Sequence, residues 1–339
     1  MIKYLGSKRR LIPKLMEIAA QAAPDARSVV DVFSGTSRVA QAFKRRGLRV
    51  LANDHNAYAA TLARCYVAAD DSHRDDATRL VNELNSTRPR AGWFTTTFCE
   101  EARYFTPENG ARIEAIRERI SSLHLPPELE AVMLVSLMEA ADRVDSTVGV
   151  QMAFLKSWAP RALQPLSLRV PELLPCSPHG KSEVWQLDAL EAAQTLHADV
   201  AYLDPPYNQH SYLGNYHVWE TLVRFDRPDV YGVARKRVDV QARTSPFNQR
   251  TFARTALHDV LGALRAPIVL VSFSDEGFYE VDELTSLLAA HGRIAVHAVD
   301  VDRYVGAKIG IYNPSGQRVG RISHTKNREL IFVVDKRAI

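Results

Sequence analysis

Short apolar runs alternate with segments of helical periodicity near both ends of this chain, and this alternation restricts the fold more than any other feature. SVVDVFS (residues 28–34) and LRVLANDHN (residues 48–56) are rich in β-branched and apolar residues and are predicted as buried strands. Helical spacing follows each of them, and the first helical segment stops at Gly47. The pattern is typical of a doubly wound, Rossmann-like α/β sheet with helices on both faces.

The alternation is interrupted between residues 70 and 180, where we predict no buried strand. That stretch contains two helical segments, 108–123 and 126–144, and ends in a proline-rich segment. Strand and helix patterns then resume, with strands at 182–188, 199–207 and 266–275, helices at 250–265 and 281–292, and a closing antiparallel pair at 293–305 and 329–337. We therefore predict an α/β domain of residues 1–69 and 181–339 with a mostly helical insertion of residues 70–180.

Composition narrows the class of protein only modestly. The 339 residues are 46% hydrophobic and carry a formal net charge of +4, which is too weak alone to indicate nucleic-acid binding. The three cysteines have neither metal-site nor disulfide spacing. We find no signal peptide, no apolar run long enough to span a membrane and no histidine spacing typical of a metal site. The expectation is a soluble cytoplasmic protein without a metal.

Ligands of an open α/β sheet bind at the carboxyl ends of its strands, so the residues at those ends are the candidates for a site. Gly35 follows the first strand, and Asp54 ends the second strand 19 residues later, the spacing at which an acid binds ribose hydroxyls. FSGTSRVA has a single glycine where a dinucleotide fingerprint has three. A ligand with a ribose but no pyrophosphate, such as S-adenosylmethionine, fits this pattern. Taken singly, Gly35 could be only a tight turn and Asp54 only a helix cap.

The predicted strand VAYL leads directly into Asp204-Pro205-Pro206-Tyr207. A carboxylate and a backbone carbonyl held by stiff prolines can accept both N–H bonds of an aromatic amine. The adjacent phenol ring can stack on a base that has left its helix. The motif therefore indicates a site for the 6-amino group of adenine. The alternative is a strand terminated by prolines, with an acid at the surface.

These motifs, in this order, resemble the alpha-class DNA adenine methyltransferases, the DNA adenine methylase family. The resemblance covers the whole chain: KYLGSK, then DVFSGTSRVA, Asp54, the insertion, Asp188 and DPPY. It implies a methyltransferase that uses S-adenosylmethionine, with the insertion as its target recognition domain. One departure is Ser37, which stands where many relatives have a second glycine.

The resemblance also implies a role for each matched residue. The implied cofactor-binding residues are Tyr4, Gly6, Ser7, Lys8, Asp31, Phe33, Gly35, Asp54, Leu187, Asp188 and Asp204. The implied catalytic residues are Asp204, Pro205, Pro206 and Tyr207. Without the resemblance, residues 4–8 would be interpreted as a basic N-terminal arm.

A DNA methyltransferase must bind duplex DNA and turn its target base out of the helix. Residues 224–254 contain eight basic and three acidic residues, a local net charge of +5 that could hold phosphates. The segment could equally be a solvated loop. The DNA-binding residues that we predict here and in residues 209–217 are Tyr212, Asn215, His217, Arg235, Lys236, Arg237 and Arg243.

Other substrates stay open. Methylation of cytosine at carbon 5 needs a catalytic cysteine, and Cys176 precedes the wrong strand. Methylation of the cytosine 4-amino group, of RNA or of a protein glutamine would use a similar site, although the glutamine enzymes usually carry Asn at the position of Asp204. A protein that binds nucleic acid without turnover is the non-enzymatic alternative. A restriction endonuclease acting on the same DNA site is a possible partner.

Overall fold

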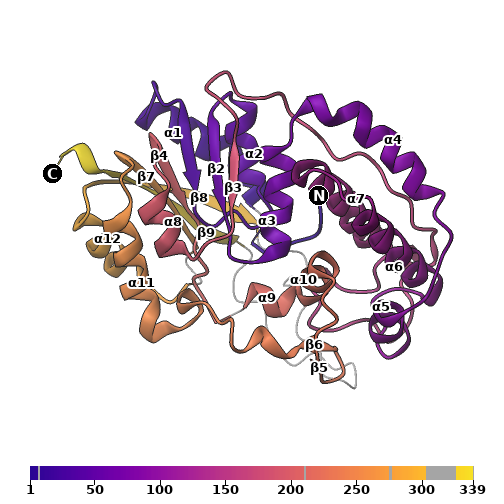
Figure 1. Cartoon of the computed structure of the whole chain (residues 1–339). Coiled ribbons are helices and arrows are strands. Elements are labelled where there is room, and N and C mark those ends of the chain that lie inside the picture. The colour runs from indigo at the N-terminus through magenta and orange to yellow at the C-terminus, as the bar shows by residue number, and fades with distance from the viewer. Residues whose placement is uncertain (7, 210, 275–276, 303–325, 339) are drawn as a thin grey trace.

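A seven-stranded mixed sheet forms the centre of the computed structural model, which describes residues 1–6, 8–209, 211–274, 277–302 and 326–338 (Figure 1). Its strand order is β3-β2-β1-β4-β7-β9-β8. The first five of these strands are parallel, and β9 runs antiparallel to both of its neighbours. The bounds are β1 Ser28–Asp31, β2 Arg49–Asn53, β3 Glu183–Trp185, β4 Val200–Leu203, β7 Ile268–Ser274, β8 Arg293–Asp302 and β9 Lys326–Asp335. The predicted α/β fold class and the closing antiparallel pair are confirmed.

Alternate residues of the central strands point to opposite faces of the sheet, as the pleat requires. On one face, Val30 and Ala201 share a core with α8 (Ala189–Thr195), α11 (Arg250–Ala263) and α12 (Val281–Ala289). On the other face, their neighbours Val29 and Val200 pack against α1 (Ile12–Ala22) and α2 (Arg38–Arg45). Helices on both faces explain why these strands are continuous apolar runs.

Helices gather beside one end of the sheet (Figure 1). Residues 70–181, all of which the structure describes, contain no strand. Their helices are α4 Arg74–Asn85, α5 Trp93–Thr95, α6 Pro107–Ser122 and α7 Pro127–Arg143. The predicted segments 108–123 and 126–144 are therefore confirmed as α6 and α7. Apolar residues of these helices share one core with α3 (Ala57–Ala63) and α10 (His217–Arg224), so the proposed insertion packs tightly on the rest of the chain.

Two predicted boundaries differ from the structure. The strand expected to end at Asp188 ends at Trp185, because Asp188 caps α8 by accepting a hydrogen bond from the Leu190 N–H at 2.9 Å. The helix expected to end at Gly292 ends at Ala289. Gly292 instead lies against β9, where an added Cβ would be 2.6 Å from the Asp335 carbonyl oxygen. Among the described residues, no helix is both long and apolar enough to cross a membrane.

Candidate active site

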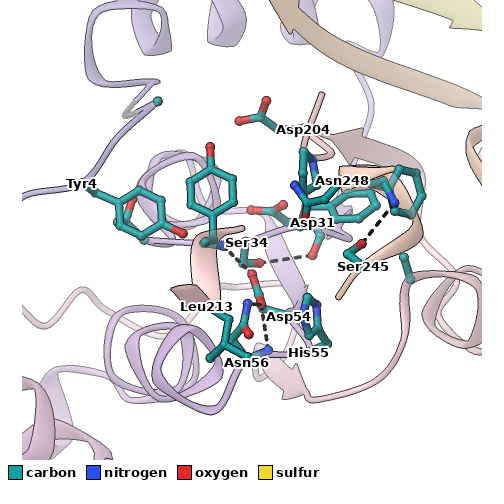
Figure 2. Close-up of a pocket in the computed structure, with 18 of the residues that line it drawn as sticks. Tyr4, Asp31, Ser34, Asp54, His55, Asn56, Asp204, Leu213, Ser245 and Asn248 are labelled. Atoms are coloured by element: carbon teal, nitrogen blue, oxygen red, sulfur yellow. Dashed lines mark hydrogen bonds between the residues drawn. The ribbon is translucent and has the colours of Figure 1, made fainter. Parts of the chain in front are cut away.

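The strands that follow β1 in sequence are added on one side of it, toward β2 and β3, and those that follow β4 on the other, toward β7. A cavity opens at this switch point, where β1 and β4 pair. Figure 2 shows residues that line it. The cavity encloses about 930 Å³ of space not filled by atoms, including open solvent. The switch point of a doubly wound sheet is the place where such folds bind ligands. Predicted site residues that line it are Tyr4, Gly6, Lys8, Asp31, Phe33, Gly35, Asp54, Asp188, Asp204 and Pro206.

The turn after β1 is fixed by Asp54, which ends β2. Asp54 Oδ2 accepts a hydrogen bond from the Gly35 N–H at 3.0 Å, and Oδ1 accepts one from the Asn56 N–H at 2.9 Å. Gly35 has a φ of 50°, which a glycine adopts without strain. Asn56 Nδ2 also donates to Oδ1 at 3.3 Å. A carboxylate has about four lone-pair directions, so Asp54 can still accept a bond from a ligand hydroxyl.

Ser37 takes the backbone conformation that the missing second glycine would favour. Its φ of 60° and ψ of 20° place it in the left-handed region, and its side chain is fully buried. Such a conformation costs a residue with a Cβ about 1 kcal/mol. The loop therefore keeps its shape despite the departure from the family pattern, at a small cost in stability.

Asp31 is a buried carboxyl group at the end of β1. In Figure 2 its carboxyl group lies between those of Asp204 and Asp54. Burial, followed by the nearby charge of Asp204, raises the pKa of Asp31 to about 8. Its Oδ1 atom has no hydrogen-bond partner among the described residues, although it lines the cavity. An unsatisfied buried acceptor at a cavity wall is suited to a cationic or N–H-bearing ligand group.

Asp204 follows β4 and pairs with Lys8. Lys8 Nζ lies 3.2 Å from Asp204 Oδ1 and donates to Glu329 Oε2 at 3.0 Å. Burial opposes the charge of Lys8, but Asp204, Tyr207 and Glu329 outweigh it and raise the pKa of Lys8. Burial also raises the pKa of Asp204 to about 6, against the lowering effect of Lys8. Asp204 is therefore a carboxylate at neutral pH and a strong acceptor.

Two groups of packed aromatic rings lie near this carboxylate, and Tyr4 and Tyr212 of the first group line the cavity. Tyr4 stacks on Tyr212 and Tyr216, with ring centroids 5.2 and 4.5 Å apart. Tyr207 packs on Phe273 at 5.2 Å, with Lys8 Nζ 5.5 Å from its ring centroid. The site thus combines a carboxylate, a cation and flat apolar surfaces, the combination needed to orient a planar amine.

Comparison with known proteins identifies the family. Residues 4–284 match the D12 class N6 adenine-specific DNA methyltransferases. This chain belongs to that family. It is 28% identical over 319 residues to the type II methyltransferase M.NlaIII of Neisseria lactamica, covering 91% of this chain and 93% of that protein.

Two other relatives are longer than this D12 class methyltransferase. It is 29% identical to the type II methyltransferase M.FokI of Planomicrobium okeanokoites, over 86% of this chain and 47% of that protein. It is 26% identical to the modification methylase LlaI of Lactococcus lactis subsp. lactis, over 89% of this chain and 51% of that protein. The chain therefore spans about half the length of these two relatives.

Three further predicted residues of this D12 class methyltransferase, Leu187, Pro205 and Tyr207, do not line the cavity but are next in sequence to residues that do. The Leu187 N–H donates to Asn53 Oδ1 at 2.9 Å, which holds the β3–α8 connection beside β2. Pro205 is buried, and Tyr207 is partly buried against the core on the α11 face. Ser7 lies outside the described residues.

Three of the predicted DNA-binding residues occupy positions that do not fit contact with DNA. Asn215 and His217 are buried, and burial lowers the pKa of His217 to about 3. Arg237 is 1% exposed and donates to Asp226 at 2.7 Å and to Asp239 at 2.9 Å. Each therefore supports the fold, and we correct the prediction for all three.

Much of the charge of the basic segment is paired within the protein. Arg243 donates to Glu220 at 2.7 Å, and Arg235 Nε lies 3.3 Å from Glu101. Glu220 and Glu101 lie outside residues 224–254, so the local charge of +5 counted from the sequence does not include them. The positive potential that DNA would meet is therefore weaker than that count suggests. Tyr212 and Arg243 line the cavity, whereas Arg235 and Lys236 lie on the hairpin of β5 (Val230–Tyr231) and β6 (Lys236–Arg237).

Several residues of the site were not predicted from the sequence. Glu329 could have been found, because the start of an antiparallel strand lies at the carboxyl edge of its parallel neighbour. Ser245, Phe247 and Asn248 also line the cavity, and no sequence signal pointed to them. Phe247 packs edge-on against Phe33 at 5.0 Å, which explains how this loop completes the wall beside β1.

Proposed function

We propose that this chain transfers a methyl group from S-adenosylmethionine to the 6-amino group of an adenine in double-stranded DNA. The observation that carries the proposal is Asp204, an ionised acceptor at the end of β4, opposite Lys8 in the cavity at the switch point. Membership of the D12 class supports the reaction and the base. Methylation of the cytosine 4-amino group remains the alternative for this site.

The cavity beside β1 and β2 fits the proposed cofactor. Asp54 would accept bonds from the ribose hydroxyls, since its carboxylate already faces the Gly35 turn. Asp31 Oδ1 would accept a bond from the ammonium group, because it is buried and lacks a partner among the described residues. Asp188 and Leu187 would lie at the adenine end, and Phe33 and Tyr4 would pack on its apolar surfaces. When bound, S-adenosylmethionine supplies an electrophilic methyl group.

The remaining residues would orient the target base. Asp204 would accept one N–H bond of the amine and the carbonyl group of the proline turn the other, which directs the nitrogen lone pair toward the methyl donor. Tyr207 would stack on the base and offset part of the cost of turning it out of the helix. The proton released from nitrogen would pass to Asp204 or to water.

DNA would approach from the side of the hairpin and the helical insertion. We propose Arg235 and Lys236 as phosphate contacts and Tyr212 as a contact beside the target base. We also propose residues 1–69 and 181–339 as the catalytic part and residues 70–180 as the part that reads the recognition sequence. We also propose a place in a restriction-modification system, which the relatives' name, type II methyltransferase, supports. On this proposal a restriction endonuclease is the partner and the cytoplasm is the compartment.

Labelling tests this function. Tritiated S-adenosylmethionine is incubated with unmethylated genomic DNA and the labelled nucleoside is identified. We expect label in N6-methyl-2′-deoxyadenosine and a loss of at least roughly 100-fold in Asp204→Ala, because a buried acceptor is removed from the transition state. Asp282→Ala, an exposed carboxyl on α12, should keep full activity. Label in N4-methyl-2′-deoxycytidine would show that the target base is cytosine. If the protein binds the cofactor but the DNA carries no label, the proposal is contradicted.

A further inference from the structure

Glu329 brings a second carboxylate to the cation that pairs with Asp204. It lies opposite Ser274, at the end of β7, so the antiparallel β9 carries it to the edge of the sheet where the cavity opens. Its Oε2 atom accepts a bond from Lys8 Nζ at 3.0 Å, and the same Nζ lies 3.2 Å from Asp204 Oδ1. Two carboxylates thus share one ammonium group.

The three side chains are largely removed from solvent. Lys8, Asp204 and Glu329 are 7%, 19% and 16% exposed. A charge in such surroundings needs a partner, and an ammonium group has three N–H donors with which to serve two carboxylates. If Glu329 were neutral, Asp204 would be the only carboxylate paired with Lys8 among the described residues, and attraction would draw the ammonium group onto it.

We infer that Glu329 is a positioning residue that holds Lys8 between the two carboxylates and so keeps Asp204 free to accept an N–H bond of the target amine. This inference rests on the proposed methyl transfer to adenine. An acceptor that is fully engaged by an ammonium group has fewer lone pairs left for a neutral amine. Glu329 would therefore act on the reaction through Lys8, without touching the substrate.

Charge near Asp204 comes mainly from these two neighbours. Lys8 favours the carboxylate, whereas burial and Glu329 disfavour it. Among the residues that the structure describes, the other titratable groups that face Asp204 are Asp31 on β1, Tyr202 on β4, Tyr207 in the same turn and Tyr212 on α9. Burial raises the pKa of Asp31, Tyr202 and Tyr212, which keeps these groups uncharged at neutral pH. Removing the charge of Glu329 should therefore lower the pKa of Asp204.

Glu329→Gln keeps the size of the side chain and removes its charge. We expect kcat at pH 8 to fall about ten-fold, because Lys8 engages Asp204 more fully, while KM for S-adenosylmethionine changes less than about three-fold. We also expect the acidic limb of the pH–rate profile to move down by about one pH unit. A general loss of stability would lower kcat without moving the acidic limb of the pH–rate profile to lower pH. The two effects together are therefore specific to the proposed role.

Glu183→Gln is the matched control, since Glu183, on the edge strand β3, pairs with Arg49 on β2, and four strands separate β3 from β9. Glu183→Gln should change neither kcat nor the acidic limb of the pH–rate profile. Thermal unfolding of each variant shows whether it folds. A wild-type enzyme that labels no adenine would contradict the proposed function. An active wild type whose acidic limb stays in place in Glu329→Gln would overturn the inference about Glu329.

Direct titration of Asp204 needs no turnover. Infrared spectra of the carboxyl bands are recorded against pH for the wild type and Glu329→Gln, and the spectra of matching Asp204→Asn variants are subtracted. We expect the pKa of Asp204 to be lower by about one unit in Glu329→Gln. Equal pKa values in the two proteins would overturn the inference, whatever the substrate of the enzyme.

Discussion

Two carboxyl groups of this site, Asp31 and Asp204, are largely removed from solvent, and burial disfavours their ionised form. Asp31 and Asp204 end neighbouring strands, and burial raises the pKa of both, to about 8 and about 6. The difference follows from Lys8, which faces Asp204 and stabilises its carboxylate. One acid is thus mostly neutral and the other ionised at neutral pH, although the two lie in one cavity.

Asp31→Asn tests the cost of this burial in the unliganded protein. The folded protein holds the Asp31 proton more tightly than the unfolded chain does, so stability falls as pH rises toward about 8. Asparagine stays neutral, and we expect the stability of Asp31→Asn relative to wild type to increase by about 4 kcal/mol between pH 5 and pH 9. Urea unfolding at the two pH values measures it. A difference between the proteins that does not depend on pH would contradict the assignment.

Between the helices, a single loop residue organises the start of α10. Gln151 Oε1 accepts hydrogen bonds from the N–H groups of Val218 at 3.0 Å and Trp219 at 3.3 Å. Its carbonyl oxygen accepts a bond from Tyr104 Oη at 2.7 Å and lies 2.9 Å from His217 Nε2. These contacts satisfy N–H groups that a helix cannot satisfy itself, and they fix α10 beside the cavity.

Gln151→Leu should therefore destabilise the protein by about 2 kcal/mol, because buried N–H groups at the start of α10 lose their acceptor. Denaturant unfolding, followed by the fluorescence of the buried Trp219, reports the loss. Gln241→Leu is the control, since Gln241 is exposed, and it should change stability by less than about 0.5 kcal/mol. Equal effects of the two substitutions would show that the contacts of Gln151 contribute nothing.

Helices and strands with a clear hydrophobic pattern could be predicted from the sequence. The contacts between these elements could not. The apolar runs of β1, β4 and β7 and the periodicity of α6 and α7 specify their own conformations. The ends of β3 and α12 depend instead on a cap at Asp188 and on the close approach of β9 to Gly292. Residues such as Arg237 looked like DNA contacts because a sequence does not show which carboxylates its charge will meet in the fold.

Across the whole molecule, α3 and the π-helix Arg64–Ala68 that continues it connect the sheet to the helical part. Ala63 and Val67 pack into the core on the α1 and α2 face of the sheet. Tyr58 and Leu62 pack into the core that holds α4, α6, α7 and α10. Because both faces of this segment are buried, the proposed insertion and the sheet should not unfold independently.

Hydrogen exchange checks this coupling. Amides of α7 and β4 should exchange with the same opening free energy, within about 1 kcal/mol, as denaturant is raised. Leu62→Ala should lower both values together by about 3 kcal/mol, because it leaves a cavity in the shared core. Earlier exchange of α7 than of β4 would indicate two separate cooperative units.

The position of β9 has a consequence for protein synthesis. It lies between β7 and β8, although both precede it along the chain. A growing chain must therefore leave a gap in its sheet until residues 326–335 have emerged from the ribosome. The same strand carries Glu329 to Lys8 and Asp204, so on our proposal a half-made enzyme would hold its active-site cation in the wrong place. Methylation would begin only after the last strand is inserted.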